Sequence, residues 1–467
     1  PRYGVVFLPL AGTMRFALFA FSMGCSRPPT EPAPLVLLVS FDTTRADALS
    51  CYGASDAATP HADALAHNGV RFEWAISSSS TTLAAHTAVM SGRDSHDHQV
   101  PRNGFAVPPE LPLLAERFHA AGWYTLASVG SYALEESMGL NRGFDRYEDH
   151  ADWKGAVFGL YEASGSEVTR SAMSLVDTRP RDTPVFLFVH YYDPHMPWTS
   201  APASVRVGFV DPKYRGKVAG DRTGIGFLTN QTVQGSLSPE DRAHARGLYL
   251  AEVAWADQQL GRLLDGLRER NLLDDSLVVL FSDHGEMFDE EPARPWRHGP
   301  DVDLPIIHVP LIVSGTGTLA TPQRTVVPTT VRTLDIGSTL LNAIGQSDPL
   351  GEGRDLSTLW RGQPPEDWPV ALAEATKPLE QLRTDTWPNA NLERAAVSQT
   401  QITTRAPWLD ALDHSFQRDA VQTPTATPEP SLTAALDAFD ARQPDHRSPA
   451  YGNETRDALK ALGYLDD

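Results

Sequence analysis

Three long, largely apolar runs, each followed at once by polar residues, constrain the fold of this chain most. The runs LVLLVSF, PVFLFVH and SLVVLFS occupy residues 35–41, 184–190 and 276–282. Runs of this kind are typical of parallel strands that are buried on both faces of a sheet. We therefore expect a central sheet that carries its functional groups at the carboxyl ends of its strands, where α/β sheets bind ligands.

Helical patterns lie between these runs. Apolar residues recur at helical spacing over residues 111–118 and, on a longer helix, over residues 253–267. Two further buried strands are expected at Tyr124–Val129 and Pro310–Ser314. Because strands alternate with helices, the sequence predicts an α/β fold with a mixed sheet and helices on both faces.

The chain is expected to consist of three parts. Residues 1–34 form an N-terminal segment and tether, residues 35–345 form the main α/β domain, and residues 346–467 form a small C-terminal subdomain with a tail. Beyond about residue 345, Pro, Gly, Asp and Thr become frequent and the periodic segments become short, as at Val370–Ala375 and Leu432–Phe439. Irregular stretches are expected near residues 376–392 and 420–430.

The N-terminal segment indicates export. Arg15 precedes the apolar stretch FALFAFSMGC, and Gly24-Cys25 resembles a bacterial lipoprotein cleavage box. An ordinary signal, a single membrane anchor or buried structure remain alternatives, although Pro9 and Arg15 interrupt the stretch that would have to span a bilayer. We expect a protein of the periplasm or cell envelope that meets the membrane only through this segment, with lipid anchoring at Cys25 as one form of attachment.

Composition narrows the classes of partner. Of the 467 residues, 41% are hydrophobic and 21% are charged, which is ordinary for a globular protein. The net charge of −20 and the absence of a Lys/Arg run argue against nucleic acid as a partner. An anionic substrate is compatible with this charge, because a bound metal and a few His or Arg side chains set the local field of a site. With only two cysteines, no disulfide framework holds the fold, and nothing in the sequence indicates the oligomeric state.

Four residues could hold a divalent cation. Asp42 follows the first run, Asp283 and His284 follow the third, and Thr82 stands at the start of an expected helix. Together they would supply three oxygens and one nitrogen, a suitable set for one cation. The alternative for Asp42 is a turn or capping residue, whereas two adjacent ligand types before Gly285 favour a metal or catalytic role.

Thr82 itself has two interpretations. It opens the stretch TLAAHTAVMSGR, and backbone N–H groups at a helix start favour an anionic ester group there. Thr is also a common N-cap, so Thr82 is either a nucleophile or a helix cap.

Four further side chains are candidates for contact with an anionic ester. His195 lies in DPHMPW, where two prolines stiffen the loop, and could donate a hydrogen bond or protonate a leaving group; packing beside Trp198 is the alternative. His298 could reach the same site or belong to a surface loop. His86 and Arg45 complete the set, either as anion contacts or as supports that orient ligands.

These residues fall in segments that resemble the sulfatase family of the alkaline phosphatase superfamily, in its bacterial branch. The similar segments occur in the family's order and together cover residues 35 to about 345. They are LVLLVSFDTTRAD (35–47), the stretch 51–77, TLAAHTAVMSGR (82–93), FLFVHYYDPHMPW (186–198), the stretch 248–267, LVVLFSDHGE (277–286) and HVPLIVSG (308–315). The resemblance implies an alkaline-phosphatase-like mixed sheet between helices, with a small C-terminal subdomain, and makes residues 35–345 the catalytic domain.

The resemblance also implies roles. A metal would be held by Asp42, Asp283 and His284, Thr82 would be both nucleophile and metal contact, and His195 with His298 would touch the substrate group. The family's all-oxygen site suits Ca²⁺, whereas a His ligand suits Zn²⁺ or Mn²⁺. The implied activity is hydrolysis of a sulfate ester on a small anionic molecule, a glycan or a lipid headgroup.

One departure from the family pattern opens alternatives. Sulfatases carry Cys or Ser in a C/S-x-P-x-R signature and oxidise it to formylglycine, but here Thr82, Ala84 and His86 take those places. Thr cannot become formylglycine, so none is expected. A directly attacking Thr resembles phosphodiesterases and phosphoethanolamine-type transferases of the superfamily. A binding protein that keeps the fold without turnover is the third interpretation.

Overall fold

The structure is a computed structural model that describes residues 33–150, 162–363, 365–376, 391–406, 413–418, 424–425 and 427–442. The predicted export segment up to residue 32 and most of the predicted irregular stretch 376–392 lie outside these ranges. Among the described residues, no helix is both long enough and apolar enough to cross a membrane.

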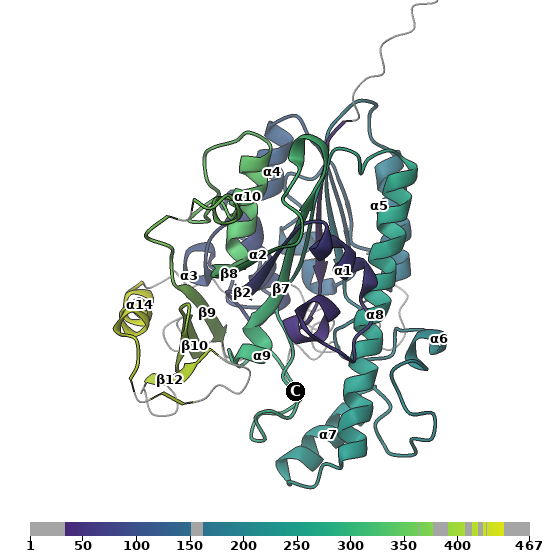
Figure 1. The fold of residues 1–467 in the computed structure, drawn as a ribbon, viewed down its shortest axis with the longest axis vertical. Helices are drawn as coiled ribbons and strands as arrows, with labels where there is room; N and C mark the ends of the chain where they lie inside the picture. The colour runs from purple at the N-terminus through teal and green to yellow at the C-terminus, as the bar shows by residue number, and fades with distance from the viewer. Residues whose placement is uncertain are drawn as a thin grey trace, which may run out of the picture. The chain divides into compact units, whose positions relative to one another are not determined.

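An eight-stranded sheet forms the centre of the fold (Figure 1). Strand β7 runs antiparallel to both of its neighbours, and every other neighbouring pair is parallel, so the sheet is mixed, as predicted. In spatial order the strands are β4 (Arg146–Glu148), β3 (Tyr124–Val129), β5 (Val185–Tyr191), β1 (Leu35–Phe41), β6 (Ser276–Ser282), β7 (His308–Gly315), β2 (Val70–Ile76) and β8 (Thr325–Arg332).

The register of the three central strands sets the position of the polar residues. Phe41 of β1 lies opposite Tyr191 of β5 on one side and Ser282 of β6 on the other. Because these parallel strands end at the same level, the residues after them leave the sheet side by side. Asp42 and Asp283 are therefore neighbours, although they are 241 positions apart in the sequence.

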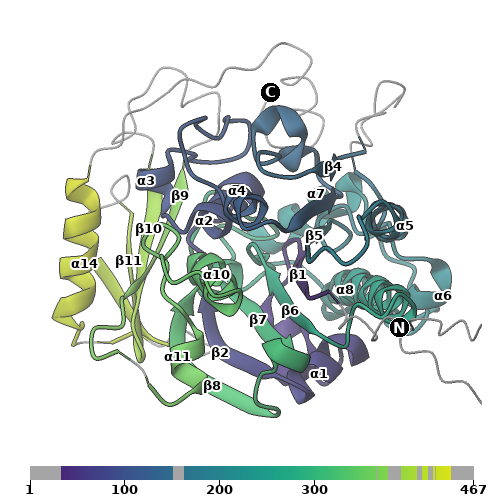
Figure 2. The same cartoon turned by 90° about the horizontal axis from the view of Figure 1, so that it is seen from above.

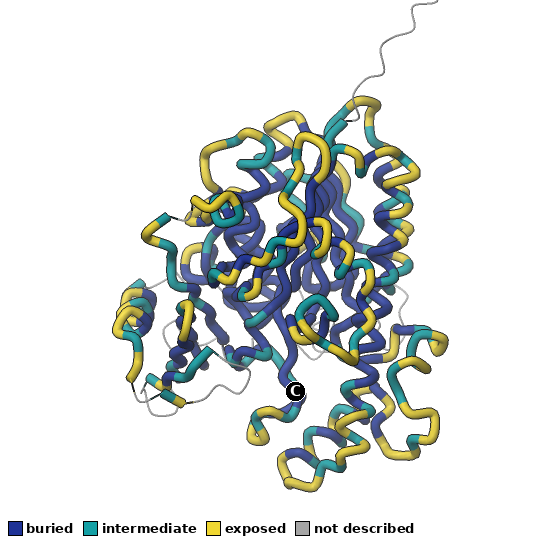
Figure 3. Tube along the Cα trace, in the orientation of Figure 1, coloured by how far each residue is buried: buried dark blue, intermediate teal, exposed yellow. Residues whose placement is uncertain are grey.

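Helices cover both faces of the sheet (Figure 2). One face carries α1 (Pro60–His67), α5 (Gly165–Asp177) and α8 (Pro239–Glu269), and the other carries α2 (Thr82–Ser91), α4 (Leu114–Ala120) and α10 (Ile336–Ala343). Along β1, Leu37 packs into the first layer and Leu38 into the second. All residues of β1, β5 and β6 are buried, in the dark blue centre of the molecule (Figure 3). Each fully buried leucine, such as Leu37 or Leu38, contributes about 2 kcal/mol through removal of its apolar surface from water.

Local signals explain where the covering helices begin. Helix α8 starts at Pro239, and the Ser238 hydroxyl accepts a hydrogen bond from the Asp241 amide at 3.0 Å. Helix α4 starts at Leu114, because the Leu113 amide donates to the Glu116 carboxylate at 2.8 Å. The predicted helical face at residues 111–118 is therefore partly a loop before α4.

A second, antiparallel sheet lies in the C-terminal part. Its strands lie in the order β12 (Asp413–Gln417), β11 (Gln401–Arg405), β10 (Asn391–Val397) and β9 (Ala371–Thr376). Helix α14 (Pro430–Ala441) packs against it through Leu432 and Leu436. The predicted segments at 370–375 and 432–439 correspond to β9 and α14, whereas β10 to β12 were not predicted. Further α-helices are α3 (Ser95–His98), α6 (Ala203–Arg206), α7 (Arg222–Val233), α9 (Leu304–Ile307) and α11 (Ser357–Trp360).

Candidate metal centre and active site

The two strand-end aspartates meet at the carboxyl edge of the sheet, and both are fully buried. The Asp283 Oδ1 atom accepts hydrogen bonds from the amides of Thr43 at 3.2 Å and His284 at 2.9 Å. Its other oxygen, Oδ2, lies 3.4 Å from His284 Nε2. The backbone thus fixes one oxygen of Asp283 and leaves the other directed at its neighbours.

Three atoms at this edge fit a divalent cation. Asp42 Oδ1, Asp283 Oδ2 and His284 Nε2 have no hydrogen-bond partner within the described ranges, although all three side chains are fully buried. The ligand atoms of this trio lie within 4.8 Å of one another. Unpaired buried charges cost several kcal/mol each, and a cation between them would remove that cost. The residues present therefore suit the metal that the sequence predicts.

The orientation of His284 supports this fit. Its Nδ1 lies 3.1 Å from the carbonyl oxygen of Gly285, to which it can only donate. A proton on Nδ1 leaves the lone pair of Nε2 for a metal, as is usual for ligating histidines.

Burial raises the pKa of Asp42 to about 7, with the Glu286 charge raising it further and His284, the Thr43 amide and Thr82 opposing the rise. A cation bound at neutral pH would therefore have to compete with a proton at Asp42.

Gly285 allows the metal-site turn to pack closely against α9. A Cβ atom at this position would lie 2.1 Å from the Pro305 carbonyl oxygen, which is far inside contact distance. The Gly285 amide donates to the Ile306 carbonyl at 2.6 Å. The glycine after Asp283-His284 is thus required by the approach of two backbones, not by a turn with positive φ.

Thr82 is the first residue of α2, and the N-cap position belongs to Thr81. The Thr82 hydroxyl donates to Asp42 Oδ2 at 3.5 Å and is fully buried. The Leu83 amide in the first turn is satisfied by Asn103 Oδ1 at 2.7 Å. The capping interpretation of Thr82 is therefore corrected, because its side chain turns toward the aspartate and another residue serves the helix amide.

His86 lies one turn further along α2, fully buried beneath Thr82. Its Nδ1 lies 2.8 Å from the Thr82 carbonyl oxygen and its Nε2 lies 2.9 Å from the Ser40 hydroxyl. Burial lowers the pKa of His86 to about 3, so the ring is neutral. Because both nitrogens are engaged inside the protein, His86 is suited to hold the start of α2 and has no nitrogen left for the predicted anion contact.

Arg45 is likewise engaged elsewhere. Its guanidinium forms ion pairs with Asp47 at 2.7 Å and with Glu290 at 2.5 Å. It also lies over the Phe288 ring, with 4.9 Å between the guanidinium carbon and the ring centroid. Two carboxylates therefore already neutralise the Arg45 charge, which the sequence analysis had proposed for contact with an anionic substrate.

His195 and His298 come together from different loops. Their Nε2 atoms lie 3.2 Å apart, within hydrogen-bond distance, and the tautomers of the two rings decide which nitrogen donates. The Glu286 carboxylate holds His298 Nδ1 at 3.1 Å, and the Tyr192 hydroxyl lies 2.6 Å from His195 Nδ1. Burial, together with the charge of His298, lowers the pKa of His195 well below its usual value. The pair can take up or deliver a proton at these nitrogens.

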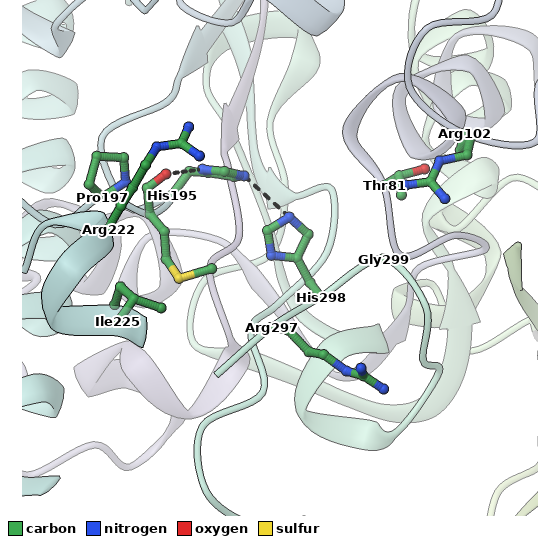
Figure 4. A pocket seen from close by; sticks show the side chains of 10 residues that line it. Thr81, Arg102, His195, Pro197, Arg222, Ile225, Arg297, His298 and Gly299 are labelled. Carbon is green, nitrogen blue, oxygen red and sulfur yellow. Dashed lines mark hydrogen bonds between the residues drawn. The ribbon is translucent and has the colours of Figure 1, made fainter. Parts of the chain in front are cut away.

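A cavity of about 320 Å³ opens beside this pair (Figure 4). Among the described residues, its lining contains Arg and His side chains and apolar side chains but no carboxylate, in a chain with a net charge of −20. The lining residues are Thr81, Arg102, His195, Met196, Pro197, Arg222, Ile225, Arg297, His298 and Gly299. The cavity is therefore suited to an anionic ligand.

The sequence analysis missed several residues of this region. His190, the next to last residue of β5, is fully buried with Nε2 3.3 Å from Asp42 Oδ2, and burial lowers its pKa to about 4. Its place at a strand end was a signal that could have been used, as was Glu286 in the segment DHGE. Arg102 and Arg222 lie far from any recognised motif, and only the fold brings them to the cavity.

The fold belongs to the alkaline-phosphatase-like α/β class. A family model described as Sulfatase matches residues 34–346, and the chain belongs to the sulfatase family. A curated relative, the ulvan-active sulfatase of Formosa agariphila, is 27% identical over 72% of this chain and 66% of its own length. A second relative is matched over 62% of its length, so the chain spans less than two thirds of both.

Solved structures share the fold. The structure of BT4656 in complex with its substrate D-glucosamine-2-N,6-O-disulfate has a TM-score of 0.67 at 17% identity, covering 90% of this chain and 100% of that one. The phosphonate monoester hydrolase from Silicibacter pomeroyi has a TM-score of 0.63 at 19% identity, covering 88% and 94%. At these identities the likeness confirms the predicted fold class and nothing narrower.

Proposed function

We propose that the chain is a metal-dependent hydrolase of sulfate esters. The observation that carries the proposal is the set of three buried ligand atoms without hydrogen-bond partners, on Asp42, Asp283 and His284, directly beside the Thr82 hydroxyl within the described part of a sulfatase-family chain. A cation, a hydroxyl nucleophile and a proton-carrying pair are the parts that ester cleavage at sulfur needs.

Each part of the site supports one role. A divalent cation held by Asp42, Thr82, Asp283 and His284 would supply polarisation of the ester and a lower pKa for the nucleophile. Attack by Thr82 Oγ1 would form a bond to sulfur and break the bond from sulfur to the leaving oxygen. His195 or His298 would give a proton to that oxygen. Asp42 Oδ2 already accepts the hydrogen bond of the Thr82 hydroxyl and so offers its proton a first acceptor. Water would then cleave the threonine ester.

Turnover of an aryl sulfate by the purified, metal-loaded protein tests this proposal. We expect release of the phenol, its loss after chelation of the metal, and its recovery when Ca²⁺, Zn²⁺ or Mn²⁺ is returned. The cation that restores turnover identifies the metal. A His ligand favours Zn²⁺ or Mn²⁺, whereas the resemblance to the family favours Ca²⁺. Absence of sulfate release under all three metals would refute the proposal.

Phosphoryl ester cleavage is the second candidate, and Thr82 is the observation that favours it. Thr cannot be oxidised to formylglycine, whereas a direct threonine nucleophile suits a phosphodiesterase or a phosphoethanolamine-type transferase. An aryl phosphodiester assayed beside the aryl sulfate separates the two classes. If metal binds and neither ester turns over, the third interpretation, a binding protein without turnover, gains support.

We further propose that the substrate is a small anionic ester, a glycan or a lipid headgroup, and that the protein is exported and attached to the cell envelope at Cys25. The apolar stretch before Gly24-Cys25 supports the attachment. A Cys25→Ser variant is expected to move the protein from the membrane fraction to the soluble periplasmic fraction. An unchanged distribution would argue against lipid anchoring and leave the catalytic proposal untouched.

A further inference from the structure

Arg222 is a cation of the cavity wall to which the proposed reaction gives no role. In the described part of the chain, its exposed side chain has neither a hydrogen bond nor an ion pair, whereas Arg297 on the same cavity is neutralised by Asp301 at 2.7 Å. The Arg222 charge is close enough to His195 to add, after burial and the His298 charge, to the lowering of the pKa of His195. An unpaired guanidinium therefore faces the cavity next to the site of ester cleavage (Figure 4).

The Glu162 carboxyl group also lies within range of the Arg222 charge. Burial raises the pKa of Glu162 to about 8, although a hydrogen bond from Tyr192 and the charge of Arg222 oppose the rise. Within the described residues no hydrogen bond or ion pair joins Glu162 to Arg222, so the charge of Arg222 remains available to the cavity.

Two contacts fasten the helix that carries Arg222. Before α7, the Gly220 carbonyl accepts from the Trp198 amide at 2.8 Å, and a Cβ at Gly220 would lie 2.4 Å from the Trp198 carbonyl oxygen. Near the end of α7, the Thr232 hydroxyl accepts from the Trp296 indole N–H at 2.8 Å. Trp198 follows the His195 loop and Trp296 precedes His298, so α7 is tied to both histidine loops and its first turn is preorganised.

The first turn of α7 presents a mixed surface to the cavity. Arg222 and Ile225, three positions apart and therefore on one face of the helix, both line it. Met196 and Pro197 line it as well, beside His195. An apolar patch thus accompanies the histidine pair, where the ester would react, and the positive charge of Arg222. A carbon skeleton that carries anionic groups at two places matches this arrangement better than a simple ester with one charge.

We propose that Arg222 binds a second anionic group of the substrate. The substrate class is then an ester whose non-reacting part carries a carboxylate or a further sulfate, as in acidic or multiply sulfated saccharides. The guanidinium suits either group, because its planar fork donates two parallel hydrogen bonds to a carboxylate or a sulfate. The inference rests on the proposed function for the reacting ester, and it adds the identity of the second group.

Binding to a turnover-deficient protein tests the inference apart from the chemistry. In a Thr82→Ala background loaded with the metal, calorimetry would compare glucosamine-6-O-sulfate with glucosamine-2-N,6-O-disulfate. We expect the disulfated sugar to bind more tightly and Arg222→Gln to reduce that advantage about tenfold, the effect of losing a charge-assisted hydrogen bond. Arg222→Lys is expected to keep part of the advantage, which should also fall with added salt because Arg222 is exposed.

The matched control is Arg170→Gln. Arg170 is also exposed on a helix, α5, but does not line the cavity, so its loss changes the net charge equally and should leave the binding ratio as it was. Equal effects of the two variants, an unchanged ratio in Arg222→Gln, or no binding of either sugar would overturn the inference. Failure of the wild-type protein to hydrolyse sulfate esters, with the binding ratio still dependent on Arg222, would refute the proposed activity alone. Melting curves would confirm that each variant is folded.

Discussion

At the residue scale, Asp283 divides its two carboxylate oxygens between two tasks. Backbone amides hold Oδ1, so the side chain cannot turn away, and Oδ2 is left for a cation. A second acidic cluster, formed by Asp301, Asp303 and Glu393, also has metal-like spacing. There the Arg294 guanidinium lies 2.5–3.2 Å from all three carboxylates and replaces a metal as the neutralising charge.

This difference predicts the effect of two substitutions on metal content. Asp283→Ala should weaken binding of the divalent cation roughly a hundredfold or more. Removal of an outer group that only orients a metal ligand already lowers metal affinity by up to about a hundredfold, and Asp283 is a proposed ligand itself. Asp303→Asn should leave metal content unchanged. Mass spectrometric metal analysis of dialysed protein measures both. Unchanged metal in Asp283→Ala would remove Asp283 from the site.

Thr82 leads to a second prediction at this scale. Brief exposure to an aryl phosphodiester or an aryl sulfate, followed by intact-mass analysis and peptide mapping, should reveal an adduct on Thr82. We expect the phosphate adduct to accumulate more than the sulfate adduct, since a directly attacking Thr resembles the phosphodiesterases and phosphoethanolamine-type transferases of the superfamily. The adduct should disappear in Thr82→Val.

The control for the adduct is Thr87→Val, on the same helix. The Thr87 hydroxyl donates to the Leu83 carbonyl at 2.6 Å and does not contact Asp42. This variant should still form the adduct. An adduct on another residue, with Thr82 unmodified, would show that Thr82 is not the nucleophile.

At the scale of elements, strand β9 ties the second sheet to the loops around the site. The Glu374 amide donates to the Ser78 carbonyl at 3.1 Å, close to the start of α2. The buried Glu374 carboxylate accepts from Ser95 of α3 at 2.7 Å and from Arg394 of β10 at 3.0 Å, and it lies 3.1 Å from His96 Nε2. One side chain thus joins β9, β10 and α3 beside the candidate active site.

The charge of Glu374 predicts a pH-dependent contribution to stability. Burial by itself would raise the pKa of Glu374, but His96, Arg394 and Ser95 outweigh burial and lower it from 4.5 to about 2. A lowered carboxyl pKa stabilises the folded state above pH 4.5, and the contribution is lost as the pH falls toward 2. The difference corresponds to about 3 kcal/mol at neutral pH.

Urea unfolding of wild type and Glu374→Gln measures this contribution. At pH 7 the free energy of unfolding of Glu374→Gln should be lower than that of the wild type by about 3 kcal/mol. This difference should become smaller between pH 4.5 and the lowest pH at which the protein folds. Glu429→Gln, on a carboxylate that holds Thr400 and Ser398 at the surface, should show a much smaller gap. A gap for Glu374→Gln that does not change with pH would mean that packing, and not charge, explains its effect.

At the scale of the whole molecule, the main core extends past the expected domain boundary. Leu350 and Leu356 are buried in the same cluster as Val36 and Leu38 of β1. The boundary at residue 345 remains a prediction from composition. The packing indicates that a cut there removes part of the main core.

Truncation tests this point. A chain of residues 33–345 should unfold without a cooperative transition or aggregate, because it loses two buried leucines and the β9 contact with Ser78. A chain of residues 33–442 keeps both and should melt cooperatively in calorimetry. A stable, cooperative fragment 33–345 would show that the catalytic part folds independently of the C-terminal residues.

The sequence by itself predicted the central strands of the main sheet and the family, and it proposed a set of metal ligands that stays a prediction. Those features are local, because an apolar run of seven residues specifies a buried strand wherever it lies. The residues that end such runs in parallel strands must share one edge of the sheet. Asp42, Asp283 and His284 could therefore be grouped from their positions in the sequence alone.

Only the tertiary structure decided which candidates are available to a ligand. From the sequence, Arg45, His86 and His195 were all candidates for contact with an anionic ester. In the structure, Arg45 contacts Asp47 and Glu290, and His86 contacts Thr82 and Ser40. These contacts are long-range or depend on rotamers, so the sequence did not reveal them. Arg222 carried no pattern at all and reaches the cavity through the anchoring of α7 at Trp198 and Trp296. Whether a charged side chain is already satisfied depends on its rotamer and on packing between segments, as with Arg45 and Glu290, and the sequence pattern does not record either.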